Sequence, residues 1–288
     1  MQVRDQAIST WKEFQREAER LQDLHWIYRG LPNRKRAQLK PSLERCKETY
    51  KIPSEAMLYV EGGLIRRFKR NYHHYSADAP GEFDYTEWLA LMRHHGAPTR
   101  LLDWTYSIFI ALFFALERSE TPAVIWALNV GHLDKQINAL FPDLYEKLDA
   151  SRNVREQTQF MSTFGQEDPP LNFVAALNPY RLNQRLTVQQ GTFLAQGNLE
   201  LTFEQNLAAT IGRRPSEAVM RKFVIARDPD LRRDMLRRLH RMGINRASLF
   251  PGLDGFAHSL EQLLNFPPAM TPPDAGYCFK YKASPLRN

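Results

Sequence analysis

The sequence predicts an α+β protein in which short strands form one core with helices packed around it. Two observations support this class. Short runs rich in β-branched and aromatic residues occur between longer segments whose apolar residues recur every three or four positions. In addition, no internal repeat and no linker divides the 288 residues. We therefore expect a single large domain with elaborations.

Capping signals place the helices. Ser9 or Thr10 can cap the first one, Asp84 and Glu87 form a capping-box-like pair before another, and Pro229 suits the start of a basic one. The segments predicted to be helical are 8–21, most of 41–72, 84–96, 107–116, 203–211 and 229–241.

Strands are predicted at 25–30, 123–130, 186–195 and 222–226, where short apolar or β-rich runs lie between turn signals. Residues 98–105 are predicted to form a turn. Residues 132–180 combine a helical pattern with a Pro-rich loop at 165–170, so we expect an excursion from the core there.

The composition excludes several classes of protein. With 43% hydrophobic and 25% charged residues, the chain is neither disordered nor a coiled coil. The most apolar segment, 106–116, is too short to cross a membrane, which needs about 20 residues. No secretory signal is visible at the start, and Cys46 and Cys278 fit no metal-ligand spacing. These features predict a reducing, cytoplasmic setting with no membrane partner.

The net charge of +7 comes largely from clustered arginines. Such clusters suit an anionic partner, either a phosphate-bearing small molecule or a nucleic acid, or they are solvated helix faces. In the segment 229–241, Leu231, Met235 and Leu239 recur at four-residue spacing, and the arginines take the other faces. No aromatic residues are interleaved there, which weakens a nucleic-acid interpretation.

The usual catalytic motifs are missing. The sequence has no Gly-rich phosphate loop, no GxSxG and no HExxH. Two histidine doublets occur, His73-His74 and His94-His95. Adjacent side chains on a helix point about 100° apart, so the two histidines of a doublet cannot both ligate the same ion. We therefore expect no metal site.

The segment 94–105 concentrates the polar groups. One interpretation is an ion pair between Arg100 and Asp103 that closes a loop, with Trp104 as packing. The other is the wall of a site at a helix N-terminus, where Thr105, Ser107 and free backbone N–H groups hold a phosphate or a ribose hydroxyl.

Four motifs resemble the FRG domain family. They are Tyr28-Arg29-Gly30, the segment 94–105 followed by 111–115, the segment 189–193, and the segment 249–255. The resemblance implies an FRG domain over 25–265 that includes the excursion at 132–180, preceded by a helical segment at 1–24 and followed by a Pro-rich tail at 266–288. Gly252 departs from the family, which usually has an acidic residue there, whereas Asp254 is retained.

The order of these motifs is also similar to that of ADP-ribosyltransferases. This second resemblance implies a split β-sheet core with surrounding helices, and NAD as substrate. Arg29 matches the residue that grips NAD, Thr105 with Ser107 matches the second motif, and Gln190 begins the third. Arg29 would then hold the pyrophosphate or the adenosine ribose, and Thr105 or Ser107 the nicotinamide ribose.

Other residues of these motifs are expected in the same site. Tyr28 or Trp104 would stack on nicotinamide, and His95 and Arg100 would complete the NAD-binding wall. We expect Arg29, Arg100, Asp103, Thr105 and Gln190 to converge on one cleft.

The glutamate of the third motif is absent, because Gln190, Gly191 and Thr192 occupy that region. Gln190 can hold a ribose hydroxyl but cannot take a proton near neutral pH. Gln190 and Asp103 are the candidate catalytic residues. Three outcomes are open. A carboxylate comes from elsewhere (Asp103, Glu61 or Asp254), the acceptor needs no strong base, or the protein binds without turnover.

Two functions follow from the resemblance. The first is an NAD-dependent ADP-ribosyltransferase or NAD glycohydrolase, acting on a macromolecular acceptor as a toxin or a bacterial defence effector. The second is a non-catalytic module on the same fold that binds a nucleotide or a nucleic acid. Fold-level similarity alone does not choose between them.

Overall fold

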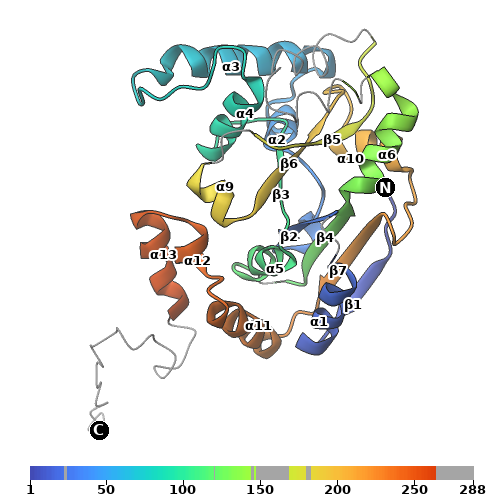
Figure 1. Cartoon of the computed structure of the whole chain (residues 1–288), viewed down its shortest axis with the longest axis vertical. Helices are drawn as coiled ribbons and strands as arrows, with labels where there is room; N and C mark the ends of the chain where they lie inside the picture. The colour runs from blue at the N-terminus through green and yellow to red at the C-terminus, as the bar shows by residue number, and fades with distance from the viewer. Residues whose placement is uncertain (23–24, 120, 144–145, 147–168, 180–182, 264–288) are drawn as a thin grey trace.

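The computed structural model describes residues 1–22, 25–119, 121–143, 146, 169–179 and 183–263. These residues form one mixed β-sheet of seven strands with helices around it, which confirms the α+β class (Figure 1). No helix in these ranges is both long and apolar enough to cross a membrane.

The strands of the sheet come from the whole length of the described chain. They are β1 Asp5–Ile8, β2 Trp26–Leu31, β3 Leu102–Thr105, β4 Ala123–Asn129, β5 Val174–Leu177, β6 Gly191–Gln196 and β7 Met220–Ile225. Their order in the sheet is β1-β7-β4-β2-β3-β6-β5. The pair β1 and β7 is parallel, and the other neighbours are antiparallel.

The sheet nearly divides between β2 and β3. These two strands are joined by the single pair Tyr28 and Thr105, whereas β2 pairs with β4 along its whole length. The strands β2 and β3 therefore form a fork in the middle of the sheet.

The helices mostly follow the predicted capping signals. They are α1 Trp11–Arg20, α2 Ser42–Tyr50, α3 Met57–Tyr72, α4 Tyr85–His94, α5 Ile108–Leu116, α6 Val130–Leu140, α9 Gln184–Val188, α10 Phe203–Ile211, α11 Pro229–Arg241, α12 Arg246–Leu249 and α13 Leu253–Leu263, with 3-10 turns η1 Arg34–Arg36 and η2 Ser54–Ala56. The side chains of Thr10, Asp84 and Ser107 accept backbone N–H groups at the starts of α1, α4 and α5.

Several local predictions are corrected. The predicted strand 186–195 begins as the helix α9, because the side chain of Asn183 caps it. Gln190 then has a φ of 46°, which turns the chain into β6. The predicted turn 98–105 ends in the strand β3.

Segments that we expected outside the sheet contribute to it. The N-terminal 1–24 contains β1 as well as a helix. The excursion at 132–180 supplies most of α6 and all of β5, and both carry buried residues of the core. The greater part of the Pro-rich loop, the tail from 266 and Cys278 lie outside the described residues.

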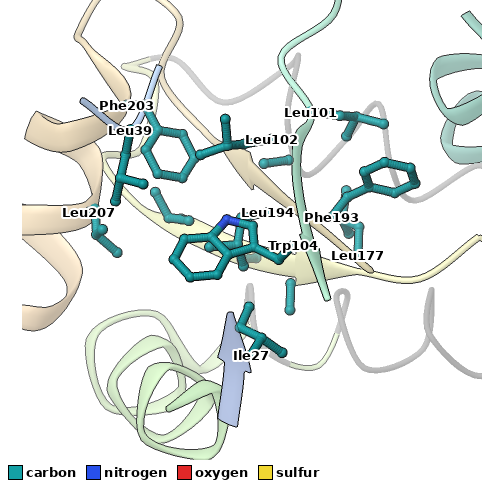
Figure 2. Close-up of a cluster of buried hydrophobic side chains, with 14 of the residues drawn as sticks. Ile27, Leu39, Leu101, Leu102, Trp104, Leu177, Phe193, Leu194, Phe203 and Leu207 are labelled. Atoms are coloured by element: carbon teal, nitrogen blue, oxygen red, sulfur yellow. The ribbon is translucent and has the colours of Figure 1, made fainter. Parts of the chain in front are cut away.

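Two apolar clusters cover the two faces of the sheet. Trp26 and Tyr28 pack on one face with residues of α1, α5 and α11, and Ile27 packs on the other with residues of α4, α6 and α10. Figure 2 shows the second cluster, with Trp104 near its centre. By strand alternation, Arg29 shares the face of Ile27.

Gly30 allows α5 to lie directly on β2. A Cβ atom at this position would stand 1.8 Å from the carbonyl oxygen of Ala111 and 2.7 Å from the amide nitrogen of Ala115. Both are backbone atoms of α5, so no side-chain movement relieves the collision.

We predict that Gly30→Ala lowers the free energy of unfolding by about 1–3 kcal/mol, the range for overpacking. The control is Gly63→Ala in α3, where a Cβ meets no atom within 4 Å. That variant should be more stable than wild type by about 0.5–1 kcal/mol, since Ala is the better helix former. Urea denaturation measures both changes. A Gly30→Ala variant with the free energy of unfolding of the wild type would contradict the close packing of α5 on β2.

Candidate functional site

A cleft of about 500 Å³ is lined by both strands of the fork between β2 and β3. The strand β2 contributes Tyr28-Arg29-Gly30, and β3 contributes Asp103 and Thr105. The C-terminal ends of α4 and α5, the short helix α9 and Phe250 after α12 complete its walls. The site thus combines the Tyr-Arg-Gly motif with residues from far along the chain.

Arg29 finds its partner across the fork. Its Nη1 donates to the backbone carbonyl of Asp103 and lies 3.7 Å from the carboxylate of the same residue. Its Nε has no hydrogen-bond partner among the described residues. Burial lowers the pKa of Arg29 to about 10, although the charge of Asp103 opposes this shift.

Asp103 is held mainly by Arg93 at the end of α4. The Nε of Arg93 donates to Oδ1 at 3.1 Å and to Oδ2 at 3.0 Å, and its Nη2 to Oδ2 at 2.5 Å. Burial raises the pKa of Asp103, but the charge and hydrogen bonds of Arg93 and the charge of Arg29 outweigh it, so the pKa lies below 3.8. Asp103 is therefore a carboxylate at neutral pH.

The predicted ion pair between Arg100 and Asp103 is wrong. Arg100 is 1% exposed and pairs instead with Glu61 of α3, where its Nε donates to the carboxylate at 2.8 and 2.9 Å. Its Nη1 also donates to the carbonyl of Gln196 at 3.2 Å. Arg100 and Glu61 lie outside the cleft lining and join α3 to the sheet.

The segment around Thr105 and the segment around Gln190 are joined by hydrogen bonds to backbone groups. The hydroxyl of Thr105 donates to the carbonyl of Gln189 at 2.7 Å and accepts from the amide of Ser107 at 3.1 Å. Gln190 is exposed, and its carbonyl accepts from the amide of Tyr106. Among the described residues Gln189, and not Gln190, lines the cleft.

Only some of the site residues predicted from the sequence therefore line the cleft. Tyr28, Arg29, Asp103 and Thr105 line the cleft, and Gln190, Ser107, His95 and Arg100 do not.

The two aromatic residues expected to stack on nicotinamide are both buried. Trp104 borders the cleft but is 3% exposed and packs in the core, as its packing interpretation predicts. Tyr28 is also buried, and its hydroxyl donates to the carbonyl of Leu21.

Sequence reasoning missed the cationic wall opposite β2. Arg185 of α9 lies over the ring of Phe250 at 4.6 Å, and Arg246 of α12 lies 4.5 Å from the same ring. Arg246 also pairs with Glu117 at 2.5 Å. Arg185 was missed because the helix that carries it was not predicted, and Phe250 because it belongs to a motif with no evident chemistry.

The described cleft carries more cations than carboxylates. Its lining contains the guanidinium groups of Arg29, Arg93, Arg118, Arg185 and Arg246 and the carboxylates of Asp103 and Glu117.

Both carboxylates are engaged by other arginines, Asp103 by Arg93 and Arg29, and Glu117 by Arg246. Arg185 has no carboxylate partner in the described part of the chain. Burial lowers its pKa, against the charge of Asp103, and the charges of Arg93 and Arg246 lower it further.

A smaller cavity of about 370 Å³ adjoins the cleft. The two share the lining residues His94, Asn183, Arg185, Arg246 and Phe250. The smaller cavity adds residues of α13, including Asp254 and His258. No group of three His, Cys, Asp or Glu side chains within the described ranges could hold a metal ion.

The family comparison identifies one part of this architecture. Residues 24–123 match the model of the FRG domain, so the chain contains an FRG domain there. The match includes β2, β3, α4 and α5, which carry one side of the cleft, whereas α9 and α12 lie beyond it. Neither the comparison with curated proteins nor that with solved structures finds a match.

We predict that Glu61→Gln lowers the free energy of unfolding by about 3–5 kcal/mol, because it removes the negative charge that faces the buried guanidinium of Arg100 and accepts its hydrogen bonds. The control is Asp230→Asn, which removes a carboxylate that is 90% exposed beside Arg233 and should change little. Thermal and urea unfolding report both effects. A Glu61→Gln variant with wild-type stability would contradict the structural role of this pair.

Proposed function

We propose that this FRG-domain protein binds NAD in the cleft between β2 and β3 and cleaves its nicotinamide–ribosyl bond, passing ADP-ribose to water or to another acceptor. The observation that carries the proposal is the surplus of guanidinium groups on the cleft wall, where Arg185 has no carboxylate partner among the residues that the structure describes. The motif order described above, which resembles that of ADP-ribosyltransferases, supports NAD as the ligand.

The charge surplus favours a phosphate ligand. Several guanidinium groups that face one cleft repel each other, and a pyrophosphate between them removes this repulsion and supplies acceptors for their N–H groups. Arg185 stacks on Phe250, and a stacked guanidinium keeps its in-plane N–H donors free for such an anion. Arg185 is therefore the residue that we expect to contact the pyrophosphate most directly.

Asp103 fits the chemical step. Cleavage of the nicotinamide–ribosyl bond builds positive charge on the ribose, which a nearby carboxylate stabilises. Of the three carboxylates that the sequence offered, Asp103 lines the cleft, whereas Glu61 pairs with Arg100 and Asp254 lines the smaller cavity. The side chain of Asp103 is 43% exposed, so a ligand can reach it.

A non-catalytic nucleotide-binding module is the second candidate. It is favoured by one observation, namely that both described carboxylates of the cleft are already engaged by arginines. The nucleic-acid form of this candidate has less support, because arginines of the basic helix α11 have local partners. Arg233 pairs with Asp230 and Arg238 with Asp234.

We predict that NAD binds the wild type and that Arg185→Ala weakens this binding by about 10- to 100-fold, as expected for the loss of a charge-assisted hydrogen bond. Arg185→Lys should recover little, because a point charge does not replace the planar fork. Isothermal titration calorimetry measures the affinity. The matched control is Arg233→Ala, which removes the same charge from the exposed side of α11.

Two results separate the candidates. Chromatography measures whether the wild type releases free nicotinamide from NAD. Release supports cleavage, whereas NAD binding without release supports the non-catalytic module. A wild type that does not bind NAD, or an Arg185→Ala variant that binds it as well as wild type, would refute the proposed site.

A further inference from the structure

His94 lies at the boundary between the two cavities. It is the last residue of α4, is half-buried, and lines both the cleft and the smaller cavity. Its neighbour His95 is exposed and lines neither of these two cavities. The doublet therefore presents one imidazole to the site and the other to solvent.

The imidazole of His94 is available as a base. Neither ring nitrogen has a hydrogen-bond partner among the described residues, and its ring contact is with His95. Burial lowers the pKa of His94 below 6.5, and the charges of His95 and Arg185 lower it further. At neutral pH, His94 is therefore uncharged and able to accept a proton.

Arginines outnumber carboxylates in the lining of the two cavities that His94 borders, which is consistent with a neutral ring. The other charged and titratable groups that line these cavities are Tyr28, Arg29, Arg93, Asp103, Glu117, Arg118, Arg185, Arg246, Asp254 and His258.

The two carboxylates of the cleft are less suited to accept the proton. The low pKa of Asp103 makes it a weak base, and Glu117 is bonded to Arg246. Gln190, which begins the third motif of the ADP-ribosyltransferase pattern, lies outside the cleft lining and carries no basic group.

On the basis of the proposed function, we propose that the smaller cavity admits a hydroxyl nucleophile, in the simplest case water, and that His94 is the general base that takes its proton. The bond between ribose C1′ and the nicotinamide nitrogen breaks, and its electron pair stays on nicotinamide, which leaves as a neutral molecule. The nucleophile oxygen forms a bond to C1′, and its proton passes to His94 and then to solvent. With water, NAD gives ADP-ribose, nicotinamide and one proton.

The position of His94 gives Asp103 and the histidine separate tasks. Asp103, on the wall of the cleft, stabilises the positive charge of the ribose, and His94, at the junction with the smaller cavity, receives the proton of the incoming group. The reaction then needs no glutamate in the third motif.

The test compares the wild type with His94→Gln. Calorimetry measures NAD binding, and chromatography measures nicotinamide release between pH 5 and 8. We expect binding to change by less than about 3-fold and release to fall by about 10²-fold or more, the usual contribution of a general base. The rate of nicotinamide release by the wild type should rise with pH through the pKa of His94 and level off near neutral pH. The His94→Gln variant should not show this rise.

Three further variants sharpen the test. Added imidazole should restore part of the release in His94→Ala, which a merely structural role would not allow. His95→Gln should shift the pH-dependent increase of nicotinamide release to higher pH, because a neighbouring charge that lowers the pKa of His94 is lost. His74→Gln, which changes an exposed histidine of the other doublet, should behave as wild type.

The outcomes are distinct. A His94→Gln variant with wild-type release and an unchanged pH profile would overturn the inference and leave the proposed function standing. A wild type that binds NAD but releases no nicotinamide at any pH would overturn the inference and the cleavage step but not the binding site. A wild type that does not bind NAD would refute the proposed function itself.

Discussion

The fork between β2 and β3 is the constraint on which the site depends. Where two strands part, their backbone groups lose partners, and an unpaired buried carbonyl is costly. Arg29 of β2 supplies the missing donor to the carbonyl of Asp103 on β3, and the carboxylate of Asp103 in turn holds Arg93 of α4. The side chain of Arg29 thus takes the place of a hydrogen bond between the two strands. The carbonyl of Asp103 keeps a donor although β2 and β3 separate there.

Local chemistry predicted much of the fold. The strand β2, the caps Thr10 and Asp84 and the helix α11 follow from patterns within a few residues, and the structure confirms them. The helix α9 was missed because five residues after an Asn cap give too little periodicity to distinguish a helix from a strand. The strand β1 was missed because its pairing with β7 joins segments more than 200 residues apart.

The candidate site was predicted less completely, because ion pairs are chosen in three dimensions. Arg100 and Asp103 are close in sequence, yet one side chain meets Glu61 in the core and the other meets Arg93 at the cleft. The FRG-like motifs agree with β2 and with the start of α5, whereas β3 was expected to be a turn. They did not reveal Arg185, which reaches the cleft lining from the short helix α9.

A structure of the protein with ADP-ribose tests most directly whether the cleft is a site for a nucleotide pyrophosphate. ADP-ribose keeps the pyrophosphate of NAD but cannot lose nicotinamide, so the result does not depend on turnover. We predict pyrophosphate oxygens at about 2.7–2.9 Å from the guanidinium of Arg185, with the rest of the ligand between β2 and β3. A ligand bound elsewhere on the surface, or an Arg185 that makes no contact with it, would contradict the assignment of this cleft.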